Sequence, residues 1–410
     1  MAYDESSYRR HDAQSADDQP TLGFPVGDFR GSEPVTAADR TVLLDEIFDD
    51  PEHGEPGRDR IGVHAFWELL LLLGTAALAF LVYQTNPDVL RGAELDALLV
   101  SATGLGLLVL AAGLALRANV PNLALGPVAV AVAYEIGEFA DRSPAQIIGF
   151  VAVAAALLGL ALALFVVVFH VPAWAASLAV GFAVVVFLDQ RAAPAQLPDD
   201  LELNRHSFYL FGGFAAVALL AGLFGTVKPL RRAIGRFRPV SDPALRRGAG
   251  AVVVAGGAIV LSMVLAGLAG VLMVASSPAV PVSSGIEWSG LALGAALLAG
   301  TSAYGRRGGV FGTVLVVALL ALFGVYSAER GWEVPTGAVA AAMIGAGLVV
   351  TRLVETFGRP RSATAGADDV EVAANTSSWS GGDGDQQESW SAALPAQPTE
   401  GLGGWGAADR

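Results

Sequence analysis

The chain has 410 residues, of which 53% are hydrophobic and only 16% charged, and its mean hydropathy is +0.54. A soluble protein of this length has about a quarter of its residues charged, so the composition indicates a membrane protein. The formal net charge of −14 argues against nucleic-acid binding, and the absence of cysteine excludes disulfides, thiolate metal sites and a cysteine nucleophile.

The chain opens with an acidic segment, residues 1–64, that we expect to be a cytoplasmic tail. It lacks the basic stretch followed by an apolar stretch that is typical of a signal peptide. A helix over residues 41–48 would carry Leu43, Leu44, Ile47 and Phe48 on one side. This pattern is equally typical of a docking segment and of a transient helix in a disordered tail.

Residues 65–353 form an apolar block in which we expect helices that cross the membrane. A helix rises about 1.5 Å per residue, so roughly 20 apolar residues cross the hydrocarbon core. Seven runs approach or exceed this length, at 66–84, 97–116, 146–169, 207–226, 249–275, 309–327 and 334–353. Three shorter pieces, at 121–137, 172–189 and 288–304, lie beside or contain Pro, Gly, Ser or Thr. Such pieces are typical of discontinuous helices that other helices bury.

The predicted fold class is therefore all-α, a polytopic membrane protein with about ten transmembrane or re-entrant helices. The order of long and short pieces over 97–189 resembles the order over 249–353, which suggests a two-repeat architecture. Residues 354–410 are rich in Gly, Ser and acids, and we expect them to be a disordered cytoplasmic tail.

The distribution of charge predicts how the chain is oriented. Seven cations lie between two apolar runs, at Lys228, Arg231, Arg232, Arg236, Arg238, Arg246 and Arg247, with a single acid, Asp242. Such a loop stays in the cytoplasm. A model with ten crossings and both termini inside places the acidic loops 85–96, 136–145 and 190–206 outside, in a multi-pass protein of the cell membrane. A model with eight crossings and two re-entrant pieces satisfies the same rule.

Signatures of catalysis are missing from the sequence. A Walker A motif needs Gly-Lys followed by Ser or Thr, and the lone Lys228 follows Val227. No HExxH zinc signature occurs, and the five histidines are scattered. We therefore expect neither an enzyme nor a cofactor nor a metal, and any ATP hydrolysis is expected on a separate subunit.

Few ionisable or aromatic side chains in the apolar block are candidates for function. We interpret Glu68, one turn into the first run, as an interfacial or capping acid. Glu135 fits a translocation path and a loop equally well. Trp174 and Trp288 begin two of the short pieces and fit either a sugar-stacking site or, more readily, the aromatic belt at the membrane interface.

Several motifs in the apolar block occur in the order of a known family. Residues 285–312 contain Ala-Gly-Thr-Ser at 299–302 and Gly-Arg-Arg-Gly-Gly at 305–309. The basic loop reads Leu-Arg-Arg-Ala-Ile-Gly at 230–235 and Asp-Pro-Ala-Leu-Arg-Arg-Gly at 242–248. Residues 97–353 thereby resemble the ribose/simple-sugar permeases of ABC importers, which are similar to branched-chain amino acid permeases. The piece at 121–126 departs from the family by lacking its acid and its serine.

The resemblance implies a permease subunit that moves a sugar or similar small polar solute. It implies as partners an ABC ATP-binding subunit, an extracellular solute-binding protein and a second permease copy or homologue. Loop 227–248 would meet the ATPase through Arg231, Arg232, Arg236, Asp242, Arg246 and Arg247. The solute path would run near the short pieces, with candidates Asn122, Glu135, Trp174, Ser177, Glu287, Trp288, Thr301 and Ser302. The alternatives are an ion-coupled secondary transporter and a non-transport membrane scaffold that assembles through its acidic tails.

Overall fold

The computed structural model describes residues 61–136, 142–190, 195–196, 203–227, 248–275, 279–280, 283–302 and 310–358. Over these ranges the chain forms ten α-helices, short 3-10 turns and one pair of two-residue strands. The acidic tails before Ile61 and after Gly358 lie outside the described residues. So does most of the basic loop, including every residue predicted to contact an ATPase.

Seven of the described helices are long and apolar enough to cross a membrane. They are α2 (Ile61–Thr85), α3 (Gly92–Arg117), α5 (Pro144–Val167), α7 (Ser207–Thr226), α9 (Gly248–Ala275), α11 (Gly312–Glu329) and α12 (Thr336–Gly358). Three shorter helices are α4 (Leu125–Ile136), α6 (Ala173–Asp189) and α10 (Ile286–Leu298). The prediction of an all-α polytopic protein with about ten helices is confirmed, and long and short pieces fall where the sequence indicated.

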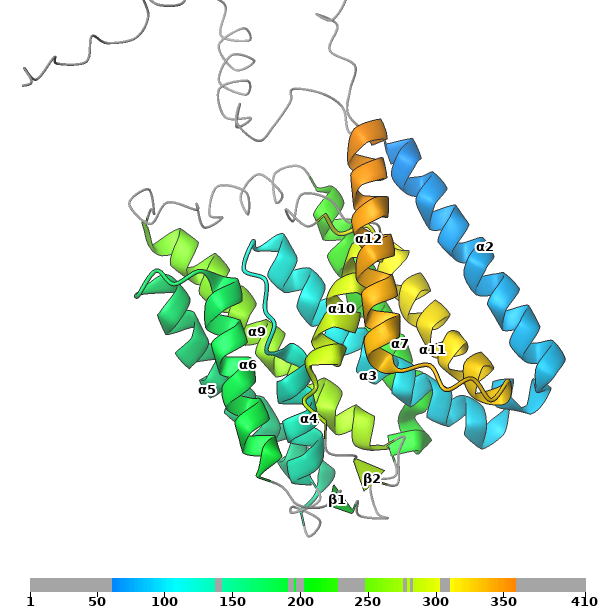
Figure 1. Ribbon diagram of the computed structural model, residues 1–410, viewed down its shortest axis with the longest axis horizontal. Helices are drawn as coiled ribbons and strands as arrows, with labels where there is room; N and C mark the ends of the chain where they lie inside the picture. Colours follow the sequence, from blue (N-terminus) through cyan, green and yellow to red (C-terminus); the bar gives the residue numbers. More distant parts are fainter. Residues whose placement is uncertain are drawn as a thin grey trace, which may run out of the picture. The chain divides into compact units, whose positions relative to one another are not determined.

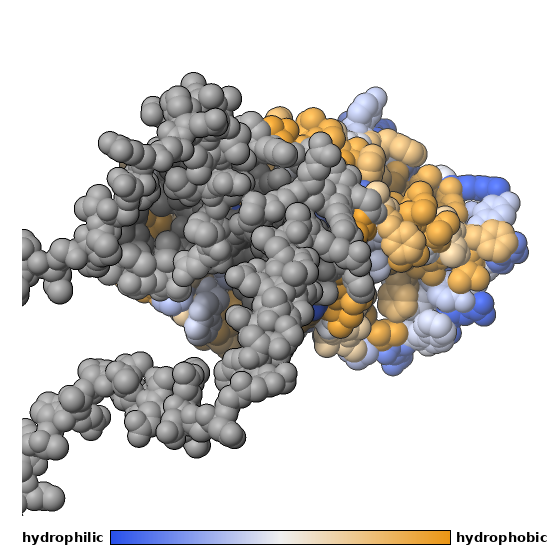
Figure 2. Space-filling view, turned by 90° about the horizontal axis from the view of Figure 1, so that it is seen from above, coloured by the Kyte–Doolittle hydropathy of each residue, from blue (hydrophilic) through white to orange (hydrophobic). Residues whose placement is uncertain are grey.

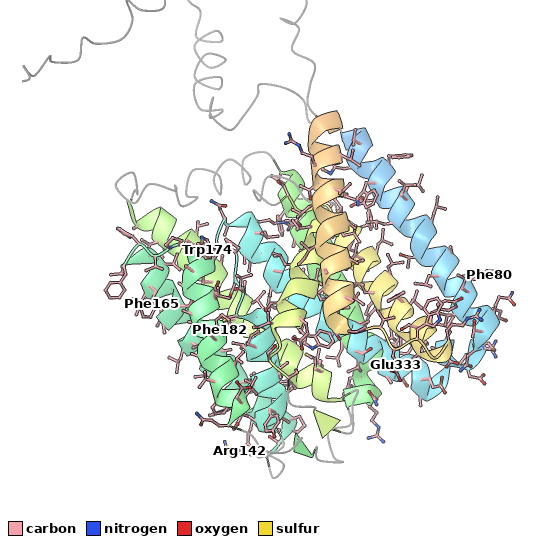
Figure 3. All side chains as sticks on the ribbon, in the orientation of Figure 1. Phe80, Arg142, Phe165, Trp174, Phe182 and Glu333 are labelled. Atoms are coloured by element: carbon pink, nitrogen blue, oxygen red, sulfur yellow. The ribbon has the colours of Figure 1, made fainter. Side chains whose placement is uncertain are left out.

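The outer surface of the helix bundle is apolar along its length. Large side chains such as Phe80, Phe165 and Phe182 are about half exposed or more and project outward from α2, α5 and α6 (Figure 3). Orange, apolar side chains cover much of the described surface seen from above in Figure 2. A soluble protein rarely exposes apolar patches on this scale, so these faces contact lipid and the chain is a multi-pass membrane protein.

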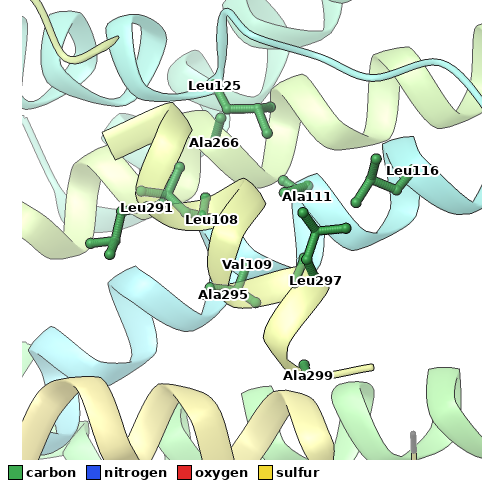
Figure 4. Packing of buried hydrophobic residues seen from close by; sticks show 14 of the residues in the cluster. Leu108, Val109, Ala111, Leu116, Leu125, Ala266, Leu291, Ala295, Leu297 and Ala299 are labelled. Atoms are coloured by element: carbon green, nitrogen blue, oxygen red, sulfur yellow. The ribbon is translucent and has the colours of Figure 1, made fainter. Parts of the chain in front are cut away.

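The centre of the bundle is formed by α3, α9 and the two short helices α4 and α10 (Figure 1). Leu108, Val109, Ala111 and Leu116 of α3 face buried side chains of α9 and α10 (Figure 4). Small residues allow this close packing, as at Gly104 of α3, where an added Cβ would lie 3.3 Å from the Leu272 Cβ atom.

Two sets of four helices pack in corresponding ways. In the first set, α3–α6, the helix α4 packs on α6, and α5 packs on α9 of the other set. In the second set, α9–α12, the helix α10 packs on α12, and α11 packs on α3. The central pairs α3/α9 and α4/α10 are antiparallel, because consecutive segments alternate in direction. This arrangement has the form of an inverted repeat, with α2 and α7 outside it.

The two sets are also linked at one end of the bundle. Strand β1 (Ala195–Gln196) follows α6, and strand β2 (Ala279–Val280) follows α9. The strands are antiparallel, with Ala195 opposite Val280 and Gln196 opposite Ala279.

Candidate functional site

The chain between α3 and α4 is extended and buried. Helix α3 ends at Arg117, and Asn119, two residues later, has a left-handed φ of 57° and lets the Val120 amide bond back to the Ala115 carbonyl at 2.9 Å. From there the chain turns back into the bundle. Val120 and Ala124 are fully buried, and only 4% of Asn122 is exposed.

Hydroxyl groups from two other helices bind the backbone of this extended segment. Ser177 Oγ of α6 accepts a hydrogen bond from the Leu123 amide at 3.0 Å and has the Pro121 carbonyl oxygen at 3.3 Å. Ser289 Oγ of α10 accepts from the Gly126 amide at 2.8 Å and donates to the Leu123 carbonyl at 2.7 Å. An interrupted helix is tolerated at membrane depth only if its freed backbone groups find such partners.

Asn122 extends this polar network to a third helix. Its Oδ1 atom accepts from the Ala124 amide at 3.0 Å, and its Nδ2 atom donates to Ser262 Oγ of α9 at 3.0 Å. Ser262 in turn donates to the Ile259 carbonyl at 2.8 Å. Asn122, Ser177, Ser262 and Ser289 are each at least 96% buried, so the network holds the segment within the protein interior.

The starts of α4 and α10 meet beside this network. A Cβ added to Gly126 would lie 1.9 Å from the Gly285 carbonyl oxygen and 2.5 Å from the Ser289 amide nitrogen. Gly285, with φ of 72°, immediately precedes α10. We call the contact of Gly126 with Gly285 and Ser289 the crossing. It lies ten residues, or about 15 Å by helix rise, from the end of α4 at Ile136.

Glu287 is the acid nearest to the crossing. It lies in the first turn of α10, where the positive end of the helix favours a negative charge, and its Oε2 atom accepts from Ser284 Oγ at 3.1 Å. Its neighbour Trp288 is partly buried against the core. An acid beside two helix starts in an apolar bundle is a candidate for function by default.

A second interruption separates α10 from α11. Gly300 has φ of 94°, and Thr301 and Ser302 are buried. Two side chains of α2 bind the helix ends on either side. Trp67 Nε1 donates to the Leu298 carbonyl at 2.8 Å, and Glu68 Oε1 accepts from the amides of Phe311 at 2.8 Å and Gly312 at 3.1 Å. Glu68 is therefore a helix-capping acid, which confirms its interpretation from the sequence.

The predicted path residues fall into separate places. Asn122 and Ser177 lie together in the network, and Glu287 and Trp288 follow the crossing along α10. Thr301 and Ser302 lie beyond the other end of α10, where the Thr301 amide bonds back to the Ala296 carbonyl at 3.1 Å. Ala296 is seven residues, or roughly 10 Å, from Ser289 along α10. Glu135 lies at the far end of α4, roughly 14 Å from Gly126.

Trp174 does not join the other path candidates. Its side chain is 56% exposed on the outside of α6 (Figure 3), although its carbonyl oxygen lies 3.2 Å from Ser177 Oγ. This position fits the aromatic-belt interpretation of Trp174 better than a stacking site at the crossing.

Sequence reasoning missed Ser262, Ser289 and Trp67. A usable signal existed for Ser262, the only hydroxyl-bearing residue within an otherwise apolar 28-residue helix. A serine in an apolar span is often placed to form a hydrogen bond to another helix. Over the described ranges, no group of three or more His, Cys, Asp or Glu side chains is placed to hold a metal ion.

Comparisons with known proteins found no matching family model, no matching curated protein and no matching solved structure.

Proposed function

We propose that this protein is the membrane-spanning permease subunit of an ABC importer and that it moves a sugar or similar small polar solute. The observation that carries the proposal is the crossing, where two short helices begin beside each other inside the bundle. Interrupted helices that meet between two inverted repeats are the usual setting of a solute site in transporters.

The crossing favours a permease over a scaffold. A protein that only anchors partners gains nothing from interrupted helices, whose freed backbone groups each need a partner away from water. Here Asn122, Ser177, Ser262 and Ser289 supply those partners. These buried polar side chains lie in an apolar interior close to Glu287, and a polar solute would pass beside them.

The proposal of an ABC importer rests on the sequence. The chain lacks a nucleotide-binding motif, so energy from ATP would have to enter through another subunit. The basic loop connects α7 to α9 and resembles the loop that meets the ATPase in sugar permeases. Its seven cations favour a cytoplasmic position by the positive-inside rule, and an ATP-binding subunit would lie on that side of the membrane. A solute-binding protein outside and a second permease copy or homologue would complete the assembly.

A second candidate is an ion-coupled secondary transporter. Glu287 favours it, because this acid lies in the first turn of α10, beside the contact of Gly126 with Gly285 and Ser289. Intramembrane acids in interrupted helices are typical sites of proton or cation coupling.

Affinity purification of the tagged full chain from native membranes, followed by mass spectrometry, tests the proposal. We expect a stoichiometric P-loop ATPase, lost when Arg246 and Arg247 are both changed to Glu. Matched changes of Arg330 and Arg352 to Glu should retain the ATPase, since both lie outside the loop. A preparation without ATPase, under conditions that preserve a known ABC importer, would contradict the proposal and favour the secondary transporter.

A further inference from the structure

We infer that helix α2 is a clamp on the junction between α10 and α11, and that Trp67 and Glu68 are its positioning residues. The inference assigns α2 a role in setting the position of α10. Its relevance to transport rests on the proposed function, but the clamp itself does not.

Helix α2 lies outside the two sets of four helices. Its main neighbour is α11, with smaller contacts to α12 (Figure 1). Leu71 and Val82 are its only buried residues among those whose burial is described, and most of its side chains face outward. Lipid solvates an apolar helix as well as protein does, so burial of apolar surface does little to fix such a helix in place.

Polar contacts therefore define where α2 sits. Trp67, Glu68 and Thr75 all bond across to other helices, and Thr75 Oγ1 lies 3.2 Å from the Leu315 carbonyl of α11 as well as 2.8 Å from its own Leu71 carbonyl. Glu68 and Thr75 are seven residues, or about two turns, apart and share one face of α2, and Trp67 is adjacent to Glu68.

The targets of Trp67 and Glu68 are helix ends that lack partners of their own. Leu298 is the last residue of α10, and its carbonyl is among the four that have no amide within the helix. Phe311 and Gly312 supply the first amides of α11, and the negative charge of Glu68 suits the positive end of that helix. The two ends also touch directly, since a Cβ on Gly312 would lie 2.2 Å from the Ala299 carbonyl oxygen.

Helix α10 is consequently held at both ends. At its start, Ser289 and Gly285 contact the crossing, and at its end, the Leu298 carbonyl is bound by Trp67. Any movement of α10 relative to α2 must break the Trp67 bond or carry α2 along. The break between α3 and α4 is contacted by the other outside helix, because Arg117 Nη1 at the end of α3 donates to the Ala221 carbonyl of α7 at 3.3 Å. The bonds from Trp67, Glu68 and Thr75 of α2 all go to α10, to α11 or to the residue that precedes α11, so the clamp acts on the second set of helices.

Hydrogen–deuterium exchange of the purified full chain in lipid nanodiscs tests this inference. Glu68→Ala removes charge and acceptor together, and we expect the amides of residues 311–315 to exchange about fivefold to tenfold faster, as for loss of a helix cap. Glu68→Gln keeps an acceptor oxygen and should give a smaller increase. Trp67→Phe keeps the ring and should raise exchange in residues 299–302.

Glu333→Gln and Trp332→Phe are matched controls at the other end of the bundle, and they should leave both segments unchanged. Unchanged exchange at 311–315 in folded Glu68→Ala protein would overturn the inference. So would an equal increase in all helices, which indicates general destabilisation. If Glu68→Ala does not fold, Trp67→Phe decides between these outcomes. None of these measurements needs an ATPase or a solute. They can therefore disprove the clamp without bearing on the proposed function, and the proposed function can be disproved without bearing on the clamp.

Discussion

At the scale of single residues, the crossing depends on the absence of one side chain. Gly126 and Gly285 bring two backbones into contact, and a Cβ at Gly126 would lie 1.9 Å from a carbonyl oxygen that belongs to the partner backbone. Backbone atoms cannot rotate out of the way as a flexible side chain can. The start of α10 would have to move as a whole.

We predict that Gly126→Ala lowers the melting temperature in detergent, with a cost of about 1–3 kcal/mol or more, as for overpacking in other cores. Gly149→Ala is the matched control, because nothing lies within 4 Å of a Cβ there and the residue faces outward in α5. Fluorescence-detected size exclusion after heating measures both. Equal melting temperatures for the two variants would show that the helices do not meet at Gly126.

The Ser289 hydroxyl is a second residue on which the crossing depends. Ser289→Ala leaves the Gly126 amide and the Leu123 carbonyl buried without their partner, and each unsatisfied group costs about 1–3 kcal/mol. We predict a clear loss of thermal stability for Ser289→Ala. Ser327→Ala should change little, since that hydroxyl bonds only to Gly324 of its own helix. A loss as large for Ser327 as for Ser289 would contradict the bridging role.

At the scale of helices, the sequence predicts the existence and order of the elements well and their ends less well. Hydropathy decides where a chain can cross lipid, and this signal is strong in runs of 20 residues. The piece expected at 121–137 is helical only from Leu125, because residues 120–124 take an extended path stabilised by serines far away in the chain. Hydropathy carries no information about partners so far away in the sequence.

The end of the last short helix shows the same limit. The piece expected at 288–304 ends as a helix at Leu298, and the run expected from 309 becomes helical at Gly312. Both ends are bound by Trp67 and Glu68, more than 200 residues earlier in the chain. Of the candidate site, the sequence identified Asn122, Ser177 and Glu287 but missed Ser262 and Ser289. Ser262 and Ser289 lie within apolar runs, and the packing of the helices decides whether such a side chain faces an interrupted helix or lipid.

At the scale of the whole molecule, the two sets of helices are joined along α3, α9 and α10. The Cβ that cysteine would add at Gly113 of α3 lies 3.9 Å from the Ala296 Cβ atom of α10, a separation that suits a disulfide. The native chain has no cysteine, so any disulfide within the chain must come from the engineered cysteines.

We predict that Gly113→Cys with Ala296→Cys forms a disulfide on mild oxidation of membranes. A protease site is introduced into a loop between the two positions. After cleavage, the two fragments stay together on a non-reducing gel only if the disulfide has formed. Gly149→Cys with Ala296→Cys is the control and should not link, because Gly149 faces outward. Efficient linkage of the control pair with none in the test pair would rule out this packing of the two sets.

The proposed function requires a solute path that reaches Glu287 beside the crossing. Reaction of a Glu287→Cys variant with a membrane-impermeant thiol reagent, in vesicles of known orientation, tests this most directly. We predict labelling from the side where α4 ends and the strand pair lies, and at least tenfold faster labelling than for the lipid-facing control Phe182→Cys. Equally slow labelling of both variants from either side would contradict the account.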